Sequence, residues 1–120
     1  MEVALMCLAL TVYHEARGEP LRGQYAVAHV VMNRVNSDFW GNTVCAVVAQ
    51  KSQFSYTKKH SFPKDIEALR LAIKVSQHVI GGYPDVTMGA THYFNPDVLL
   101  PAWAGGLQYI MRIGNHVFYK

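Results

Sequence analysis

Residues 3–24 have the sequence VALMCLALTVYHEARGEPLRGQ, in which an apolar run turns abruptly polar. The first half is apolar on every face, which is typical of a buried helix. Gly18 and Pro20 predict that the helix ends there, so it covers residues 3 to about 17. Glu15 stands near its end, and the stretch therefore predicts a carboxyl group held at the edge of a hydrophobic core.

A carboxyl group in that position suits general acid chemistry. Burial disfavours the charged form of a carboxyl group and raises its pKa. An acid that works near neutral pH needs such a raised pKa. We therefore predict that Glu15 is a catalytic acid. The alternative is an ordinary helix-end carboxylate paired with Arg17 or Arg22, and Glu19 is expected to partner an arginine or a loop backbone.

Composition indicates one compact globular domain over residues 1–120. Hydrophobic residues make up 51% of the 120 residues and charged residues 16%. The net charge of +3 favours an anionic partner, but only Lys58 and Lys59 are adjacent basic residues. This distribution gives no basic stripe for nucleic acid. An anionic polymer such as a bacterial cell wall fits, and we expect a monomer.

The apolar start of the chain could be mistaken for a targeting segment. Residues 3–13 are too few for a membrane span. Glu2 stands where a signal peptide has positive charge, and no small-x-small cleavage site follows. We therefore expect this segment to belong to the mature fold, with no stable membrane association. Export would then depend on another transport mechanism or on a longer parent chain from which this one was trimmed.

The cysteines and histidines do not predict a metal or cofactor. Cys7 and Cys45 both lie in apolar runs, so we expect two buried free thiols, with a disulfide as the alternative. His14 and Glu15 match the start of an HExxH zinc motif, but residue 18 is Gly18 instead of histidine. We therefore predict a site without metal or cofactor.

Three further helices are predicted, at residues 22–36, 44–50 and 63–80. Thr43 is a good N-cap for the second of these, and a Gly-Gly pair at 81–82 ends the third. We expect residues 51–62 to form an ordered loop with substrate contacts.

The C-terminal part changes character. THYFNP (91–96) and HVFYK (116–120) are aromatic with partial alternation, and glycine-containing turns stand at 105–106 and 114–115. A small antiparallel sheet or hairpin is therefore predicted, which makes the fold class α+β and mostly helical. Most aromatic residues should be core, but those beside Gln53, Thr87 and Asn95 could line a groove for sugar rings.

Five blocks of sequence together resemble one protein family. They are HEARGEP (14–20), GQYAVAHVVMNRV (23–35), QKSQF (50–54), DVTMGATHYFNP (85–96) and IGNHVFY (113–119). In this order they resemble the motifs of the spore-cortex-lytic, germination-type cell wall hydrolases, a family that includes phage lysins. The resemblance extends from about residue 8 to 119. It implies a peptidoglycan glycosidase with a lysozyme-like helical core.

The resemblance also implies residue roles and a reaction. The first glutamate of the EARGE block is the family's catalytic acid and falls on Glu15. The residues that would support or line the site are Glu19, Gln24, Gln53, Phe54, Thr87, Tyr93, Asn95 and His116. The implied reaction is that of a lytic transglycosylase, which cleaves between N-acetylmuramic acid and N-acetylglucosamine. A phage endolysin, made in the host cytoplasm and released by a holin, is the expected setting.

Other functions stay open at the level of sequence. A hydrolytic muramidase would need a second carboxylate, for which Glu19 is the nearest candidate in sequence. A wall-binding module would use the aromatic residues without catalysis. A metal-dependent hydrolase is a third alternative.

Overall fold

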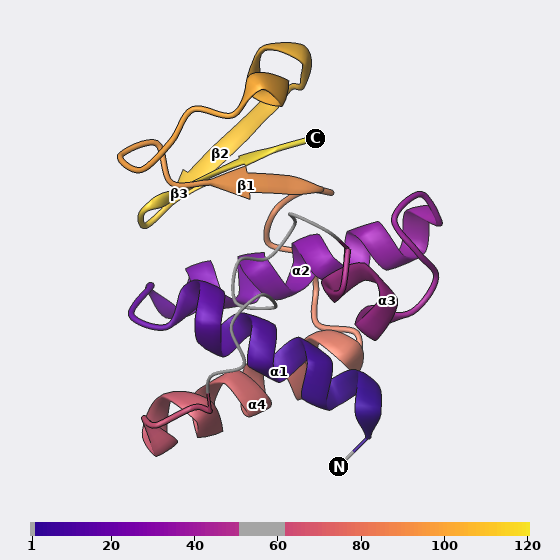
Figure 1. Cartoon of the computed structure of the whole chain (residues 1–120), viewed down its shortest axis with the longest axis vertical. Helices are drawn as coiled ribbons and strands as arrows, with labels where there is room; N and C mark the ends of the chain where they lie inside the picture. The colour runs from indigo at the N-terminus through magenta and orange to yellow at the C-terminus, as the bar shows by residue number, and fades with distance from the viewer. Residues whose placement is uncertain (1, 51–61) are drawn as a thin grey trace.

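The structure is a computed structural model, and it describes residues 2–50 and 62–120. Its helices are α1 (Val3–Ala16), α2 (Leu21–Ser37), α3 (Val44–Val48) and α4 (Ile66–Ile80). They confirm the predicted helices in type and order (Figure 1). The loop predicted at residues 51–62 lies outside the described residues except for its last member.

Helix ends are set by single residues. The side chain of Thr43 accepts a hydrogen bond from the backbone N–H of Ala46, which confirms it as the N-cap of α3. Asp65 caps α4 in the same way, through the N–H of Ala68. The predicted start of α4 at Pro63 is therefore wrong by three residues, because the capping residue has extended backbone and lies outside the helix.

α1 packs against the other three helices, and its second half supplies most of the contact with the core. Leu8 and Val12 are fully buried, whereas Val3 is 73% exposed and Met6 is 45% exposed. The prediction of a helix buried on every face is thus wrong for the first turn. It is confirmed for the part of α1 that leads to Glu15.

The two cysteines are paired. Cys7 in α1 and Cys45 in α3 form a disulfide, with their Cα atoms 5.4 Å apart. The expected free thiols are therefore wrong. The packing of α3 across α1 brings the two residues within bridging distance, which their separation of 38 positions in the sequence does not reveal.

The C-terminal part forms a three-stranded antiparallel sheet, which confirms the predicted small sheet. Its strands are β1 (His92–Phe94), β2 (Tyr109–Ile113) and β3 (His116–Tyr119), in the order β1-β3-β2. A short 3-10 helix, η2 (Ala102–Gly106), precedes β2. In Figure 1 the sheet lies above the helices, and α2 packs against both β1 and β2.

Strand alternation gives the sheet two different faces. Tyr93 pairs with Phe118, and Phe118 belongs to a buried cluster between the sheet and α2. Tyr93 also packs against the larger cluster between the helices. On the opposite face Trp103 from η2 lies against Phe94 and Tyr119. Tyr93 is thus fixed where the sheet meets the helices.

Candidate functional site

Glu15 and Tyr93 meet at the junction of helices and sheet. Glu15 is the penultimate residue of α1 and is half-buried. The Tyr93 hydroxyl donates a hydrogen bond of 2.9 Å to Glu15 Oε1. The two residues are 78 positions apart in sequence. The structure therefore brings together the predicted acid and one of the predicted site residues.

Arg34 holds the start of β1 in place. Its Nε donates to the carbonyl oxygen of Thr91 at 2.6 Å, and its guanidinium lies 4.8 Å from the Trp40 ring centroid. Burial lowers the pKa of Arg34 to about 10, although the electrostatic interaction with Tyr93 raises it in part. The side chain still carries its charge at neutral pH, so this buried cation fixes the backbone two residues before Tyr93.

Glu19 contacts the tip of the β2–β3 hairpin. Its Oε1 accepts the backbone N–H of Asn115, and its Oε2 accepts the Asn115 side-chain amide, each at 2.9 Å. Its side chain is 9% exposed. At Gly114, which has a φ of 59°, an added Cβ would lie 2.4 Å from Glu19 Oε1. The hairpin turn therefore packs directly on this carboxylate.

His116 follows this turn and lies beneath Tyr93. Its ring centroid is 4.9 Å from that of Tyr93, and its Nδ1 is 3.9 Å from Glu19 Oε1. Burial lowers the pKa of His116, and the Glu19 carboxylate opposes part of that shift. The ring is therefore neutral at neutral pH, and its contact with Glu19 is not an ion pair. Within the described part of the chain, Nδ1 has no hydrogen-bond partner.

The polar atoms of the other predicted site residues contact backbone or neighbouring residues. Gln24 donates to the carbonyl oxygen of Glu19 at 3.3 Å. The Thr87 hydroxyl donates to Asp85 at 2.7 Å, and Asn95 Oδ1 accepts the N–H of Asp97 at 2.9 Å. Their roles in binding substrate stay predictions. Gln53 and Phe54 lie outside the described residues.

Asp85 organises the loop before β1. Its carboxylate accepts hydrogen bonds from Thr87, from the Gly89 backbone and from the Asn33 side chain. Burial pulls the pKa of Asp85 upward, but these hydrogen bonds outweigh it and the pKa lies below its usual value. Asp85 therefore stays ionised as a structural anchor between this loop and α2.

Three residues of this region were missed from sequence: Arg34, Asp85 and Asn115. Arg34 lies in a helix and Asp85 in a loop, where charged residues are usually solvated. Asn115 was noted only as part of a Gly-Asn turn. All three lie inside the blocks that carry the family resemblance, and this position is the signal by which they could have been found.

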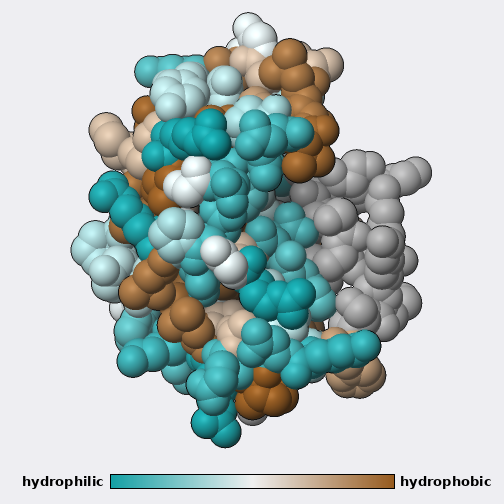
Figure 2. Space-filling view, turned by 90° about the vertical axis from the view of Figure 1, so that its left-hand side faces the viewer, coloured by the Kyte–Doolittle hydropathy of each residue, from teal (hydrophilic) through white to brown (hydrophobic). Residues whose placement is uncertain are grey.

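The face that is turned toward the viewer in Figure 2 carries hydrophilic side chains across its middle, where the C-terminal sheet meets the helices. Hydrophobic side chains lie at its upper right and also in its lower half. A surface of this mixed character suits a glycan, whose rings present both apolar faces and hydroxyl groups.

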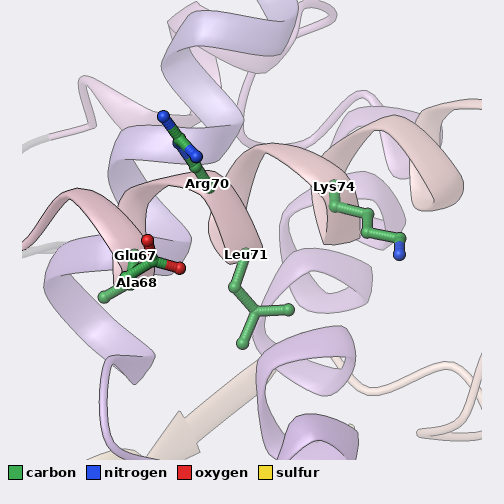
Figure 3. A pocket seen from close by; sticks show the side chains of 5 residues that line it. All are labelled: Glu67, Ala68, Arg70, Leu71 and Lys74. Carbon is green, nitrogen blue, oxygen red and sulfur yellow. The ribbon is translucent and has the colours of Figure 1, made fainter.

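A shallow pocket lies elsewhere, on α4. It is lined by Glu67, Ala68, Arg70, Leu71 and Lys74, whose side chains project from the helix in Figure 3. None of these residues was predicted for the site. Their mixed charges are typical of a solvated helix face, and we assign the pocket no part in the chemistry.

Two further properties concern the described residues alone. Residues 2–50 and 62–120 contain no group of three histidine, cysteine, aspartate or glutamate side chains placed to hold a metal ion. In the same ranges no helix is both long and apolar enough to cross a membrane.

Comparison with known proteins gives one consistent result. The family model described as cell wall hydrolase matches residues 18–119. The spore cortex-lytic enzyme of Bacillus subtilis (strain 168) is 38% identical over 112 residues, which are 92% of this chain and 35% of that protein. The chain thus spans about a third of that relative's length.

Solved structures agree with the sequence relatives. The catalytic domain of the germination-specific lytic transglycosylase SleB from Bacillus anthracis superposes with a TM-score of 0.86 at 35% identity, covering 100% of this chain and 96% of that one. The catalytic domain of the Bacillus cereus SleB protein gives a TM-score of 0.83 at 36% identity, with 98% and 89% covered.

Proposed function

The chain belongs to the cell wall hydrolase family, and we propose that it is a peptidoglycan lytic transglycosylase with Glu15 as its single catalytic carboxyl group. The observation that carries this proposal is the hydrogen bond from Tyr93 to Glu15, at the site where the family resemblance expects the acid. The similar solved domain from Bacillus anthracis bears the name of a lytic transglycosylase, which supports the same reaction.

The positions of the other carboxylates support a mechanism with one acid. The chain has eight acidic residues, all within the described ranges. Both oxygens of Glu19 accept hydrogen bonds from Asn115, Asp85 binds its own loop, and Asp65 caps α4. The remaining ones are Glu2 beside the N-terminus, Asp38 after α2, Glu67 on α4 and Asp97 in the loop after β1.

The chemistry follows from this geometry. The Tyr93 hydroxyl donates to Oε1, which leaves Oε2 of Glu15 to carry the acidic proton. Glu15 gives that proton to the glycosidic oxygen as the bond to the muramic acid anomeric carbon breaks. The resulting carboxylate then takes the proton from the C6 hydroxyl of the same muramic acid, whose oxygen closes on the anomeric carbon. The substrate thus supplies the nucleophile, and proximity replaces a second carboxylate.

The variant Glu15→Gln tests the acid. It keeps the size of the side chain and an oxygen that can accept from Tyr93, but it has no acidic proton. We expect a normal thermal unfolding midpoint and a loss of at least about a hundredfold in the lysis rate of purified peptidoglycan, within the range that general acids contribute. Glu67→Gln, on the exposed face of α4, is the matched control and should retain activity. Wild-type activity in Glu15→Gln contradicts the proposal.

Mass spectrometry of the digested wall separates the reaction types. Anhydro-muramic ends are expected for a transglycosylase, whereas reducing muramic ends would indicate a muramidase. Binding to insoluble wall without any released fragments would indicate a wall-binding module.

We propose bacterial peptidoglycan as the partner of a monomeric protein, and a phage endolysin as its biological setting. The setting is tested by expressing the chain in a bacterial cytoplasm with and without a holin. Lysis only when the holin is present is expected, and intact cells in both cases contradict the endolysin role.

A further inference from the structure

The tip of the β2–β3 hairpin links Glu19 to the site of Glu15. Glu19 is in the turn between α1 and α2, whereas Asn115 is in the turn between β2 and β3. Two hydrogen bonds of 2.9 Å join them, one from the backbone and one from the side chain of Asn115. Because one residue uses both carboxylate oxygens, the contact fixes the orientation of the turn as well as its distance.

The Glu19 side chain in this contact is 9% exposed, whereas Asn115 lies at the surface. Hydrogen bonds to a charged group are stronger than those between neutral groups. Gly114 lies so close that an added Cβ would be 2.4 Å from Glu19 Oε1 and 2.8 Å from Pro20. The turn therefore packs directly against the carboxylate, so that a shift of Glu19 moves the hairpin.

The hairpin connects the Glu19 contact to Glu15 through two further residues. His116 directly follows Asn115 and is 8% exposed. Its ring packs edge-on to Tyr93 with centroids 4.9 Å apart. The Tyr93 hydroxyl in turn donates to Glu15 Oε1 at 2.9 Å. A contact path thus runs from Glu19 through the turn, His116 and Tyr93 to Glu15.

We propose that Glu19 is a positioning residue, which acts on Glu15 through Asn115, His116 and Tyr93 and takes no part as a second catalytic carboxylate. This inference rests on the proposed function of Glu15. It predicts that the charge of residue 19 is dispensable, provided that the hydrogen bonds to the turn are kept.

An exchange of donor and acceptor tests the proposal. In Glu19→Gln an amide group faces the Asn115 amide, so one of the two hydrogen bonds is lost. In the double variant Glu19→Gln/Asn115→Asp the glutamine amide donates to the new carboxylate, and its oxygen still accepts the backbone N–H. The bond is therefore restored with its polarity reversed, and the net charge of the pair is unchanged.

The measured quantity is the initial rate of anhydro-muropeptide release from purified peptidoglycan at a temperature where all variants are folded. We expect Glu19→Gln to be about tenfold slower, as for a loss of roughly 1.4 kcal/mol of positioning. Binding to insoluble wall should not change, since both carboxylate oxygens of Glu19 are engaged by Asn115. The double variant should return to within about threefold of wild type, which a double-mutant cycle records as coupling.

The other outcomes each point to one failure. Full activity of Glu19→Gln overturns the positioning role, as does a double variant that stays as slow as Glu19→Gln. The second result would make Glu19 a catalytic carboxylate while leaving Glu15 as the acid. An active Glu15→Gln protein instead overturns the proposed function itself, whatever the Glu19 variants do.

Asn115→Ala provides a variant that leaves residue 19 intact. It removes the side-chain bond to Oε2 and keeps the backbone bond to Oε1. A loss of activity of about threefold is expected, smaller than in Glu19→Gln because no amide donor is left facing another donor. Unchanged activity would overturn the proposal even if the Glu19 variants failed to fold.

Discussion

The catalytic proposal depends on one hydrogen bond between two side chains. Tyr93 Oη donates to Glu15 Oε1 at 2.9 Å, and the tyrosine ring packs in both hydrophobic clusters. A hydrogen bond between side chains contributes about 0.5–1.5 kcal/mol. Because the ring is held by packing and the carboxyl group by α1, this bond helps to fix the orientation of the Glu15 carboxyl group.

Removal of the Tyr93 hydroxyl should therefore slow the reaction without disturbing the fold. In Tyr93→Phe the ring still packs, but Glu15 loses the hydrogen bond from the Tyr93 hydroxyl. We expect the rate of muropeptide release to fall about tenfold. The matched control is Tyr109→Phe, since Tyr109 is 52% exposed on β2. Equal rates in the two variants would show that the Tyr93 hydroxyl has no part in the reaction.

At the scale of elements, short segments are held by specific links. α3 is a helix of 5 residues, too short to be stable by itself. Thr43 caps its N-terminus, and the Cys7–Cys45 disulfide attaches it to α1. The hairpin of β2 and β3 is attached at its tip by Glu19. These links hold in place elements that secondary-structure propensity alone would not stabilise.

The disulfide should contribute strongly to stability. Its partners are 38 positions apart, and closing a loop of that size in the unfolded chain corresponds to about 4 kcal/mol. We expect Cys7→Ala/Cys45→Ala to lower the free energy of unfolding by approximately this amount in urea titrations. Wild-type protein in reductant should behave like the double variant. A change below about 1 kcal/mol in both would contradict the entropic role of the disulfide.

At the scale of the whole molecule, α2 separates two hydrophobic clusters. One lies among the helices and the other between α2 and the sheet. Buried ionisable groups lie on the side of α2 that faces β1, among them Arg34 near His92. The stability of the entire domain therefore depends on the protonation of these groups.

A fall in pH should lower the free energy of unfolding before the carboxylates titrate. Burial, together with the charge of Arg34, lowers the pKa of His92 from 6.5 to about 4. Between these two pH values His92 is protonated in the unfolded chain but neutral in the folded chain. Stability is therefore lost as the pH falls through this window. His116 acts in the same direction.

Urea titrations at several pH values between about 7 and 4 measure this effect. The free energy of unfolding of the wild type should fall toward the acidic end. The fall should be shallower in His92→Gln, which has no titrating ring. The same pH dependence in both proteins would show that His92 makes no contribution.

The sequence by itself determined the helices, and it predicted Glu15 as the acid. The apolar run before Glu15, the Thr43 cap and the glycines at 81–82 are local signals, and helices depend mainly on such local contacts. The ordered motif blocks determined the family. The start of α4 was misplaced because proline and an acidic residue can each stand at either side of a helix boundary.

Only the tertiary structure decided which distant residues meet. The Cys7–Cys45 disulfide, the anchoring of β1 by Arg34 and the seating of Asn115 on Glu19 all join segments from different elements. No local pattern encodes such pairs, because they depend on how the hydrophobic clusters orient the helices and sheet around α2. Glu15 could be predicted as the acid from one helix, whereas its contact with Tyr93 exists only after the chain has folded.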